Sequence, residues 1–505
     1  MPQRGVLAMA VLLVCLLALA PVVGLGLFGF SGTDGITALQ LGPDAPEQLR
    51  NTLSLVLMVG LLGAGLGTGT GWLTARCNFR GRRWLRIAQL LPLATPSYLL
   101  AATWIDLGSR YGMRVHGFTP TLLVLVLSTY SYVFLLATES FSVSGKRQLE
   151  ACRSLGVGPW GSFWRVALPI ALPSIGAGVA LSGMEVVNEL GAVQLLGVPT
   201  LSSGILMRWQ QDGDPQSAVS LALMALLIVT LLVGAERNLR RRSRCWNLSG
   251  TGDLDQRWRL QGGRELASQL FCLLPPLISL GLPAIWAALS WDQLSSEDSQ
   301  ELLTLGTRSF SLALGAALLT AVAAIALAIA KRWLANPLLR RLTFISGLGY
   351  AIPGTVLALA LMLIGGPLAL APLLLLVWGY ADRFLAVSKG GLDAALERIP
   401  PSVDEAATSL GHSWIAVLRR VHLPLLRGPL LMGALLVFVD TVKELPLTFA
   451  LRPFDFDTLA VRVYQYASDE RVGAALVPAL LILMLGLLAA AALIPSLERL
   501  EGRSS

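Results

Sequence analysis

The sequence predicts an all-α, polytopic membrane protein built from two tandem repeats of about six transmembrane helices each. Three observations lead to this fold class. Of the 505 residues, 54% are hydrophobic and only 14% are charged. Uncharged stretches long enough to cross a bilayer recur along the whole chain, and one segment returns 255 residues later. Soluble domains carry about 25% charged residues, so this composition excludes a soluble enzyme, a disordered scaffold and a disulfide-stapled secreted protein.

Runs of about 20 mostly apolar residues without charge predict the transmembrane helices. They lie at 5–33, 51–75, 87–105, 115–138, 166–184, 215–235, 266–291, 309–330, 342–381, 428–439 and 472–497. The run 342–381 is twice as long as one span, and Gly365-Gly366-Pro367 inside it predicts two helices joined by a tight turn. We therefore expect about twelve spans.

The first run also has the features of a signal peptide, because Arg4 precedes an apolar core and Ala18-Leu19-Ala20 lies near its end. The core from Val6 to Phe30 is longer than the apolar region of a typical signal peptide. We favour an uncleaved first span.

The charges of the loops predict the orientation. Arginine and lysine gather at 76–86, 236–264 and 331–341, and counting spans places all three segments on the side of the N-terminus. Acidic residues gather on the opposite side, at 34–47 and 292–301. By the positive-inside rule, the N- and C-termini are cytoplasmic. The net charge of +8 then reflects topology, and nucleic-acid binding is the weaker interpretation.

One segment occurs twice. Residues 150–169 read EACRSLGVGPWGSFWRVALP and residues 405–424 read EAATSLGHSWIAVLRRVHLP, with nine identities in twenty positions and no gap. The recurring residues are Glu150, Ala151, Ser154, Leu155, Gly156, Arg165, Val166, Leu168 and Pro169, and then Glu405, Ala406, Ser409, Leu410, Gly411, Arg420, Val421, Leu423 and Pro424. Two copies in the same direction predict a parallel repeat about a pseudo-two-fold axis along the membrane normal.

This repeat predicts the domain organisation. The first repeat is expected at 1–235, with spans 1 to 6 and a cytoplasmic loop at 140–169, and the second repeat at 265–497, with spans 7 to 12 and a loop at 388–424. An Arg-rich cytoplasmic linker at 236–264, which the core is not expected to need, joins the two repeats. Residues 498–505 are expected to form a cytoplasmic tail.

The chemistry of the duplicated loop suits a docking helix. Its Glu-Ala-Ala or Glu-Ala-Cys stretch offers small side chains for close approach. Gly156 and Gly411 can adopt the left-handed conformation that ends a helix. An interfacial helix resting on lipid headgroups is the alternative. The duplication with fixed polar positions favours a contact with another protein.

These residues resemble the "EAA loop" of the permease subunits of bacterial ATP-binding-cassette importers. The resemblance implies two MetI-like permease repeats in the bacterial inner membrane, with coupling helices that dock onto two copies of a cytoplasmic ATPase. It assigns the ATPase-coupling role to Glu150, Ala151 and Gly156 in the first copy, and to Glu405, Ala406, Ala407 and Gly411 in the second. The first copy departs from the pattern at Cys152, where weaker packing is expected.

The same resemblance implies the partners and the substrate. ATP and Mg would bind the partner ATPase, no cofactor is expected in this chain, and a periplasmic binding protein would deliver the substrate. Segments 183–191 and 438–466 resemble fused ferric-iron permeases most, which makes ferric iron the expected substrate. Related permeases carry thiamine, sulfate, molybdate, polyamines or phosphonates.

Charged residues near the outer end of the fifth and eleventh spans are candidates for a substrate pathway, because ionisable residues inside a membrane are costly and usually face a cavity or a partner. They are Glu185, Glu189, Asp440, Lys443 and Glu444. A structural ion-pair network or a simple helix end explains them equally well. No spacing defines a metal site, and the metal ligands, if any, stay unknown.

No catalytic residues are expected. The sequence has no phosphate-binding G-x-x-x-x-G-K-[ST] motif, and the glycine cluster 63–71 lies in a span, where it favours helix packing. An importer permease is therefore the leading hypothesis. A secondary transporter driven by protons or sodium, with Glu185, Glu189, Asp440 and Glu444 as its relay, is the main alternative of a different class. A channel or membrane enzyme is a third.

Overall fold

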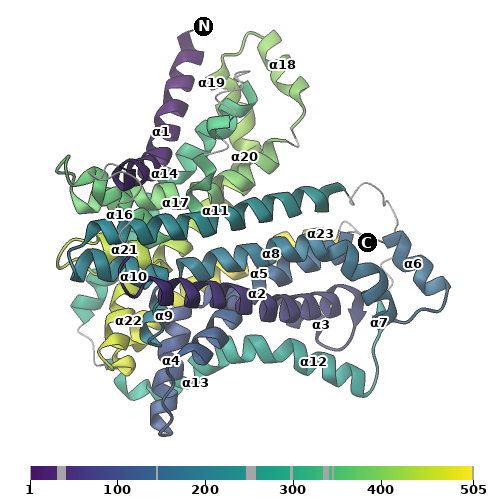
Figure 1. Cartoon of the computed structure of the whole chain (residues 1–505). Coiled ribbons are helices and arrows are strands. Elements are labelled where there is room, and N and C mark those ends of the chain that lie inside the picture. Colours follow the sequence, from purple (N-terminus) through teal and green to yellow (C-terminus); the bar gives the residue numbers. More distant parts are fainter. Residues whose placement is uncertain are drawn as a thin grey trace. The chain divides into compact units, whose positions relative to one another are not determined.

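The computed structural model is almost entirely helical (Figure 1). It describes residues 2–30, 41–143, 146–245, 257–295, 299–333, 341–343, 346–397 and 399–502. Within these residues the only strands are two-residue segments, β1 (Cys77–Asn78) and β2 (Trp258–Arg259), which pair in parallel. The predicted all-α membrane class is confirmed.

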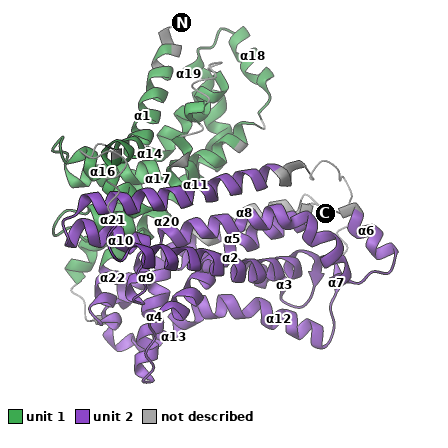
Figure 2. Ribbon diagram, in the orientation of Figure 1, with its two compact units in different colours: residues 1–39, 299–461 green, residues 40–298, 462–505 purple. Residues whose placement is uncertain are grey.

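The chain forms two compact units, shown in green and purple in Figure 2. Unit 1 comprises Met1–Leu39 and Ser299–Val461, and unit 2 comprises Gln40–Asp298 and Arg462–Ser505. The elements of unit 1 are α1 (Pro2–Phe30), α14 (Ser299–Trp333), η7 (Ser346–Ala351), α16 (Gly354–Gly365), α17 (Pro372–Leu396), α18 (Pro401–Ser409), α19 (Trp414–Val417), η8 (Leu418–His422), α20 (Leu423–Lys443) and α21 (Pro446–Leu451).

Unit 2 has more elements, and α22 (Leu459–Ser468) contains the boundary between the units. Besides the two strands they are α2 (Ala45–Arg76), α3 (Arg82–Ala88), η2 (Leu91–Ala94), α4 (Ser97–Arg110), α5 (Phe118–Val143), α6 (Lys146–Ser154), α7 (Pro159–Ser162), η3 (Phe163–Ala167), α8 (Leu168–Asn188), α9 (Gly191–Leu195), α10 (Leu201–Leu206), η4 (Met207–Gln211), α11 (Pro215–Cys245), α12 (Gly263–Pro276), η5 (Leu277–Gly281), α13 (Leu282–Leu289), η6 (Trp291–Ser295), η9 (Val472–Ala475) and α23 (Leu476–Gly502).

Each unit is built around the same set of three long helices. In unit 2, α2, α5 and α8 pack against one another, and in unit 1 their counterparts α14, α17 and α20 do the same. The helix α8 starts at Leu168 and α20 starts at Leu423, which is the 255-residue offset of the sequence repeat. The repeat in sequence is therefore also a repeat in helix packing.

Helices at the edges of the repeats do not stay with their neighbours in sequence. The N-terminal helix α1 packs on α14 and α16 in unit 1, together with elements from the second half of the chain. In unit 2, α13 packs on α4, and α23 packs on η2. The repeat boundaries expected from the sequence describe order along the chain and stay a prediction.

Eight helices of the described residues are long and apolar enough to cross a membrane, and a ninth crossing is counted if the bent pair Arg82–Ala94 and Ser97–Arg110 forms one span. Gly354–Gly365 and Val472–Leu488 are shorter apolar helices. The total of about twelve spans and the pseudo-two-fold axis therefore stay predictions.

The expected single span at 87–105 is broken, because its two helices meet at an angle of 92°. Pro96 is the N-cap of α4. A proline disfavours helical backbone at the residue before it, and Thr95 is extended. Pro353 is the N-cap of α16 in the same way. The expected break in 342–381 is confirmed, since α16 ends at Gly365 and α17 begins at Pro372.

The segment 236–264 is more structured than a linker outside the core. Helix α11 continues to Cys245, and β2 pairs with β1. The side chain of Leu260 is 7% exposed and belongs to a buried apolar cluster with Trp72 and Phe141. The expectation that the core does not need this segment is wrong for residues 257–260, because an apolar side chain there is removed from solvent.

The glycine cluster 63–71 allows α2 to approach α5, as expected. A Cβ atom on Gly67 would lie 2.7 Å from the backbone nitrogen of Phe134, whereas one on Gly65 would meet nothing within 4 Å. We predict that Gly67→Ala destabilises the protein by about 1–3 kcal/mol through overpacking, while Gly65→Ala is neutral or slightly stabilising. Thermal unfolding in detergent measures both, and equal stabilities of the two variants would contradict this packing.

Candidate functional site: two coupling loops

The first duplicated loop begins with α6, which presents Glu150 and Ala151 to solvent. Gly156 has φ +73° and ends this helix. Its N–H donates to Arg153 O at 2.9 Å, and the N–H of Val157 donates to Cys152 O at 2.9 Å. These two bonds define a Schellman cap, which requires a left-handed residue and therefore favours glycine.

The second loop has the same geometry 255 residues later. Helix α18 exposes Glu405 and Ala406 and buries Ala407. Gly411 has φ +79°, its N–H donates to Thr408 O at 3.0 Å, and the N–H of His412 donates to Ala407 O at 3.1 Å. The two loops therefore end in the same cap at the same repeat position.

An exposed leucine precedes each of these glycines. Leu155 is 81% exposed and Leu410 is 77% exposed. Each is followed by a short helix and then by a π-helical segment, Phe163–Ala167 or Leu418–His422, that leads into the next long helix. Segments of π-helix are frequent at functional sites because the wider turn costs stability.

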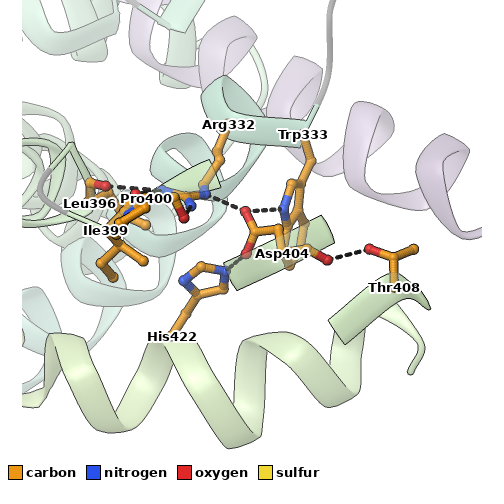
Figure 3. Close-up of polar contacts among 8 residues, drawn as sticks. All are labelled: Arg332, Trp333, Leu396, Ile399, Pro400, Asp404, Thr408 and His422. Atoms are coloured by element: carbon orange, nitrogen blue, oxygen red, sulfur yellow. Dashed lines mark hydrogen bonds and ion pairs between the residues drawn. The ribbon is translucent and has the colours of Figure 1, made fainter. Parts of the chain in front are cut away.

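An ionic clamp holds the second loop, as Figure 3 shows. The Arg332 guanidinium donates to Asp404 Oδ2 at 2.5 Å, and His422 Nε2 lies 2.8 Å from Asp404 Oδ1. The indole N–H of Trp333 donates to Asp404 Oδ2 at 3.3 Å. Asp404 thus ties α18 to the end of α14 and to the π-helical segment before α20.

Arg332 also holds the end of α17. Its guanidinium donates to the carbonyl oxygens of Leu396 and Ile399 at 3.0 Å and of Pro400 at 3.1 Å. Burial alone would raise the pKa of the Asp404 carboxyl, but its hydrogen bond with Arg332 and the neighbouring positive charges hold this pKa below its ordinary value. The clamp therefore contains a charged carboxylate at neutral pH.

The first loop keeps the arginine and lacks the rest of the clamp. The Arg76 guanidinium, at the end of α2, donates to Phe141 O at 2.5 Å, and Phe141 precedes Leu396 by 255 residues. Leu149 stands where the second copy has Asp404, and it is 4% exposed in a buried apolar cluster. The two loops share a backbone geometry and differ in how they are attached.

Glu189 and Glu444, predicted for the substrate pathway, cap short helices in this conformation. Glu189 Oε1 accepts the N–H of Ala192 at 2.9 Å, and the Ser97 hydroxyl donates to Oε2 at 2.5 Å. Glu444 Oε1 accepts the N–H of Leu447 at 2.9 Å. These paired bonds bridge the breaks after α8 and α20.

The other three residues of the predicted pathway have different partners. Lys443 Nζ lies 2.9 Å from Asp440 Oδ1, and the Tyr132 hydroxyl donates to Glu185 Oε1 at 3.2 Å. Within each unit, each of these charged groups therefore has a polar partner in the helices themselves. A role in substrate passage stays a prediction for Glu185, Glu189, Asp440, Lys443 and Glu444.

No metal-binding group of three or more histidine, cysteine or acidic residues occurs among the residues that the structure describes. The candidate site is the pair of duplicated loops, which share an exposed helix and a glycine cap. Sequence reasoning found their exposed helices and glycines but missed the clamp of Asp404, Arg332, Trp333 and His422. A usable signal was the contrast of Asp404 with Leu149 inside two otherwise matching segments.

Two repeated sets of long apolar helices, each with an exposed helix and glycine cap before the fifth expected span, define a duplicated multi-pass membrane protein. The chain belongs to the family of inner membrane components of binding-protein-dependent transport systems, which it matches twice, over residues 67–244 and 316–494. It is therefore a multi-pass membrane protein and a transport component.

Relatives in this family differ in the substrate named for them. A Fe(3+)-transport system permease protein of Haemophilus influenzae is 27% identical over 454 residues, which cover 88% of each chain. A probable sulfate permease of Nephroselmis olivacea is 29% identical over 39% of this chain and 75% of its own. A molybdenum permease of Azotobacter vinelandii is 28% identical over 30% of this chain and 71% of its own.

Proposed function

We propose that this chain carries both permease domains of an ATP-binding-cassette importer, and that α6 and α18 are its coupling helices. The observation that carries this proposal is the duplicated helix and Schellman cap, with Gly156 and Gly411 both at positive φ. An ion-driven carrier has no need of two docking elements with the same backbone geometry.

In this proposal the loops face the cytoplasm, together with both termini, because arginine-rich connections favour the cytoplasmic side of a membrane. Each loop receives one copy of a separate ATPase subunit, which binds ATP and Mg. A periplasmic binding protein delivers the substrate on the other side. Glu150, Ala151 and Gly156, with Glu405, Ala406, Ala407 and Gly411, form the two docking surfaces.

We propose ferric iron as the substrate. The support is the ferric-iron permease of Haemophilus influenzae, which aligns over both halves of this chain, while the sulfate and molybdenum permeases align over one part only. Thiamine, polyamine and phosphonate importers of the same family are alternatives. Stimulation of ATP hydrolysis by an iron-loaded binding protein is expected in the reconstituted complex, and stimulation by a thiamine- or sulfate-loaded protein alone would overturn the assignment.

The docking role predicts the effect of straining both caps. Gly156→Ala with Gly411→Ala introduces a side chain at two left-handed positions, where it costs about 1–2 kcal/mol each and meets no neighbouring atom. We expect ATPase retention during purification to fall roughly tenfold or more. Substrate uptake should be lost in parallel.

Gly428→Ala is the matched control, since a Cβ atom there also meets nothing within 4 Å and the backbone has no positive φ. Wild-type ATPase retention and uptake in the Gly156→Ala/Gly411→Ala variant would contradict the docking role. Uptake that persists without ATP and stops when the proton and sodium gradients are dissipated would favour the ion-driven carrier.

A further inference from the structure

The first coupling helix lacks the polar residues that hold the second. Cys77 follows Arg76 where Trp333 follows Arg332, and Ala167 stands 255 residues before His422. With Leu149 at the position of Asp404, the carboxylate at the centre of the second loop's clamp has no counterpart at this position. The nine-residue helix α6 is therefore attached to the spans by other contacts than those of α18.

Strand β2, from the segment that joins the two repeats, pairs with β1, which directly follows Arg76 in the chain. Trp258 pairs with Cys77 and Arg259 pairs with Asn78 in the parallel register. The N–H of Leu260 donates to Asn78 O at 3.0 Å, and the Leu260 side chain is buried. Trp258 is therefore aligned with the residue that corresponds to Trp333 in the other repeat.

Trp258 contacts the long helix and the coupling helix together. Its ring centroid lies 5.6 Å from that of Trp72 on α2. The guanidinium carbon of Arg153, on α6, lies 5.2 Å from the Trp258 ring centroid, which is within the range of a cation–π interaction. One aromatic side chain thus connects α6 to the core of unit 2.

Helix α12, which follows β2 in the chain, is hydrogen-bonded to the loop after β1. Glu265 Oε1 accepts the N–H of Arg80 at 2.9 Å, and Gln269 Nε2 donates to Arg80 O at 3.1 Å. These bonds join the start of α12 to the loop after β1. Residues 257–260 thus pair with β1 on one side and lead into α12, which is itself hydrogen-bonded to the loop after β1.

We propose that residues 257–260 form a brace that positions the first coupling helix, with Trp258 as the positioning residue that replaces the ionic clamp of the second loop. The segment that joins the two repeats then helps to position the first coupling helix. The consequence for ATPase docking rests on the proposed function, whereas the brace itself does not.

Hydrogen exchange of the full chain in detergent tests the brace. Trp258→Ala should accelerate exchange of the α6 amides by roughly tenfold and leave α18 unchanged. Trp258→Phe keeps an aromatic face and should restore most of the protection. Trp84→Ala, at a 77% exposed position on α3, is the matched control and should have no effect on α6. Unchanged exchange of α6 in Trp258→Ala would overturn the proposal.

Two further measurements separate the brace from general packing. Arg153→Met should accelerate α6 exchange as Trp258→Ala does, and the double variant should add nothing, because both remove the same contact. In a Cys77→Ala background, Asn78→Cys with Arg259→Cys should form a disulfide on oxidation, since pairing of the strands brings the two Cα atoms to a separation that a disulfide can span. Full additivity, or failure to cross-link, would overturn the brace.

ATPase retention distinguishes failure of the brace from failure of the proposed function. If the brace positions a docking helix, Trp258→Ala should reduce ATPase retention severalfold and Trp258→Phe should restore it. Faster α6 exchange with wild-type retention would support the brace and overturn the docking role of α6. Unchanged α6 exchange with reduced ATPase retention in Trp258→Ala would overturn the brace and support the docking role of α6.

Discussion

Replacing Arg332 with methionine is expected to destabilise the protein by about 2–4 kcal/mol and to release α18 from the spans. The substitution removes the hydrogen bonds to Asp404, Leu396, Ile399 and Pro400 and leaves a partly buried carboxylate without its main cation. Thermal unfolding in detergent measures the first effect, and hydrogen exchange of the α18 amides measures the second.

Lys331→Met is the matched control for this prediction. Lys331 precedes Arg332 on the same turn, and its Nζ lies 3.6 Å from Asp393 and 3.2 Å from Glu397, but its side chain is 34% exposed. Exposed ion pairs contribute below about 1 kcal/mol, so this variant should be nearly as stable as the parent. Equal destabilisation by the two substitutions would contradict a specific clamp.

A second variant separates the charge from the packing. Asp404→Leu introduces the residue type that the first repeat has at this position, Leu149. In the Arg332→Met background it removes the uncompensated carboxylate, and part of the lost stability should return. In the parent protein the pKa of Asp404 is lowered, so the stability that this carboxylate contributes is present at neutral pH and should be lost as the pH falls through that lowered pKa.

Replacing Glu444 with alanine is expected to cost about 3 kcal/mol or more and to disorder the start of α21. The Glu444 side chain is buried and accepts the N–H groups of Leu447 at 2.9 Å and of Thr448 at 3.0 Å. Two buried N–H groups without an acceptor account for a loss of this size. Glu444→Gln keeps one acceptor oxygen and should lose about half as much.

Asp440→Asn is the control on the same helix. Asp440 pairs with Lys443 at 2.9 Å, and its side chain is 25% exposed, so the change should cost below about 1 kcal/mol. Unfolding in detergent and uptake by proteoliposomes are measured together. A Glu444→Gln variant with parental stability and altered substrate affinity would contradict the capping role and support a place in the substrate pathway.

Several features of the coupling loops could be predicted from the sequence because they depend on local conformation. A left-handed residue at Gly156 and Gly411 follows from glycine at the end of a helix, and both have positive φ. The break between α16 and α17 follows from Gly365-Gly366-Pro367 for the same reason. Such effects act within a few residues, so a single chain contains all the information they need.

The bend after η2 could have been predicted in the same way, and was not. Pro96 lies inside an uncharged run that has the length of one span, and the length of that run alone predicts a single helix. In the structure the break falls at this proline, and Thr95 before it has the extended backbone that a following proline favours. The same lesson applies to Pro353, which heads α16.

The sequence by itself determined the membrane class, the 255-residue repeat and the two duplicated loops with their glycine caps, because composition and local backbone preferences decide these features. Only the tertiary structure showed that Asp404 meets Arg332 and His422, that Trp258 lies on Trp72, and that α1 packs with helices of the second half. Such contacts join residues far apart in the chain. Which residues meet depends on how the apolar helices pack against one another. All of these helices have similar hydropathy, so hydropathy does not predict which helix packs against which.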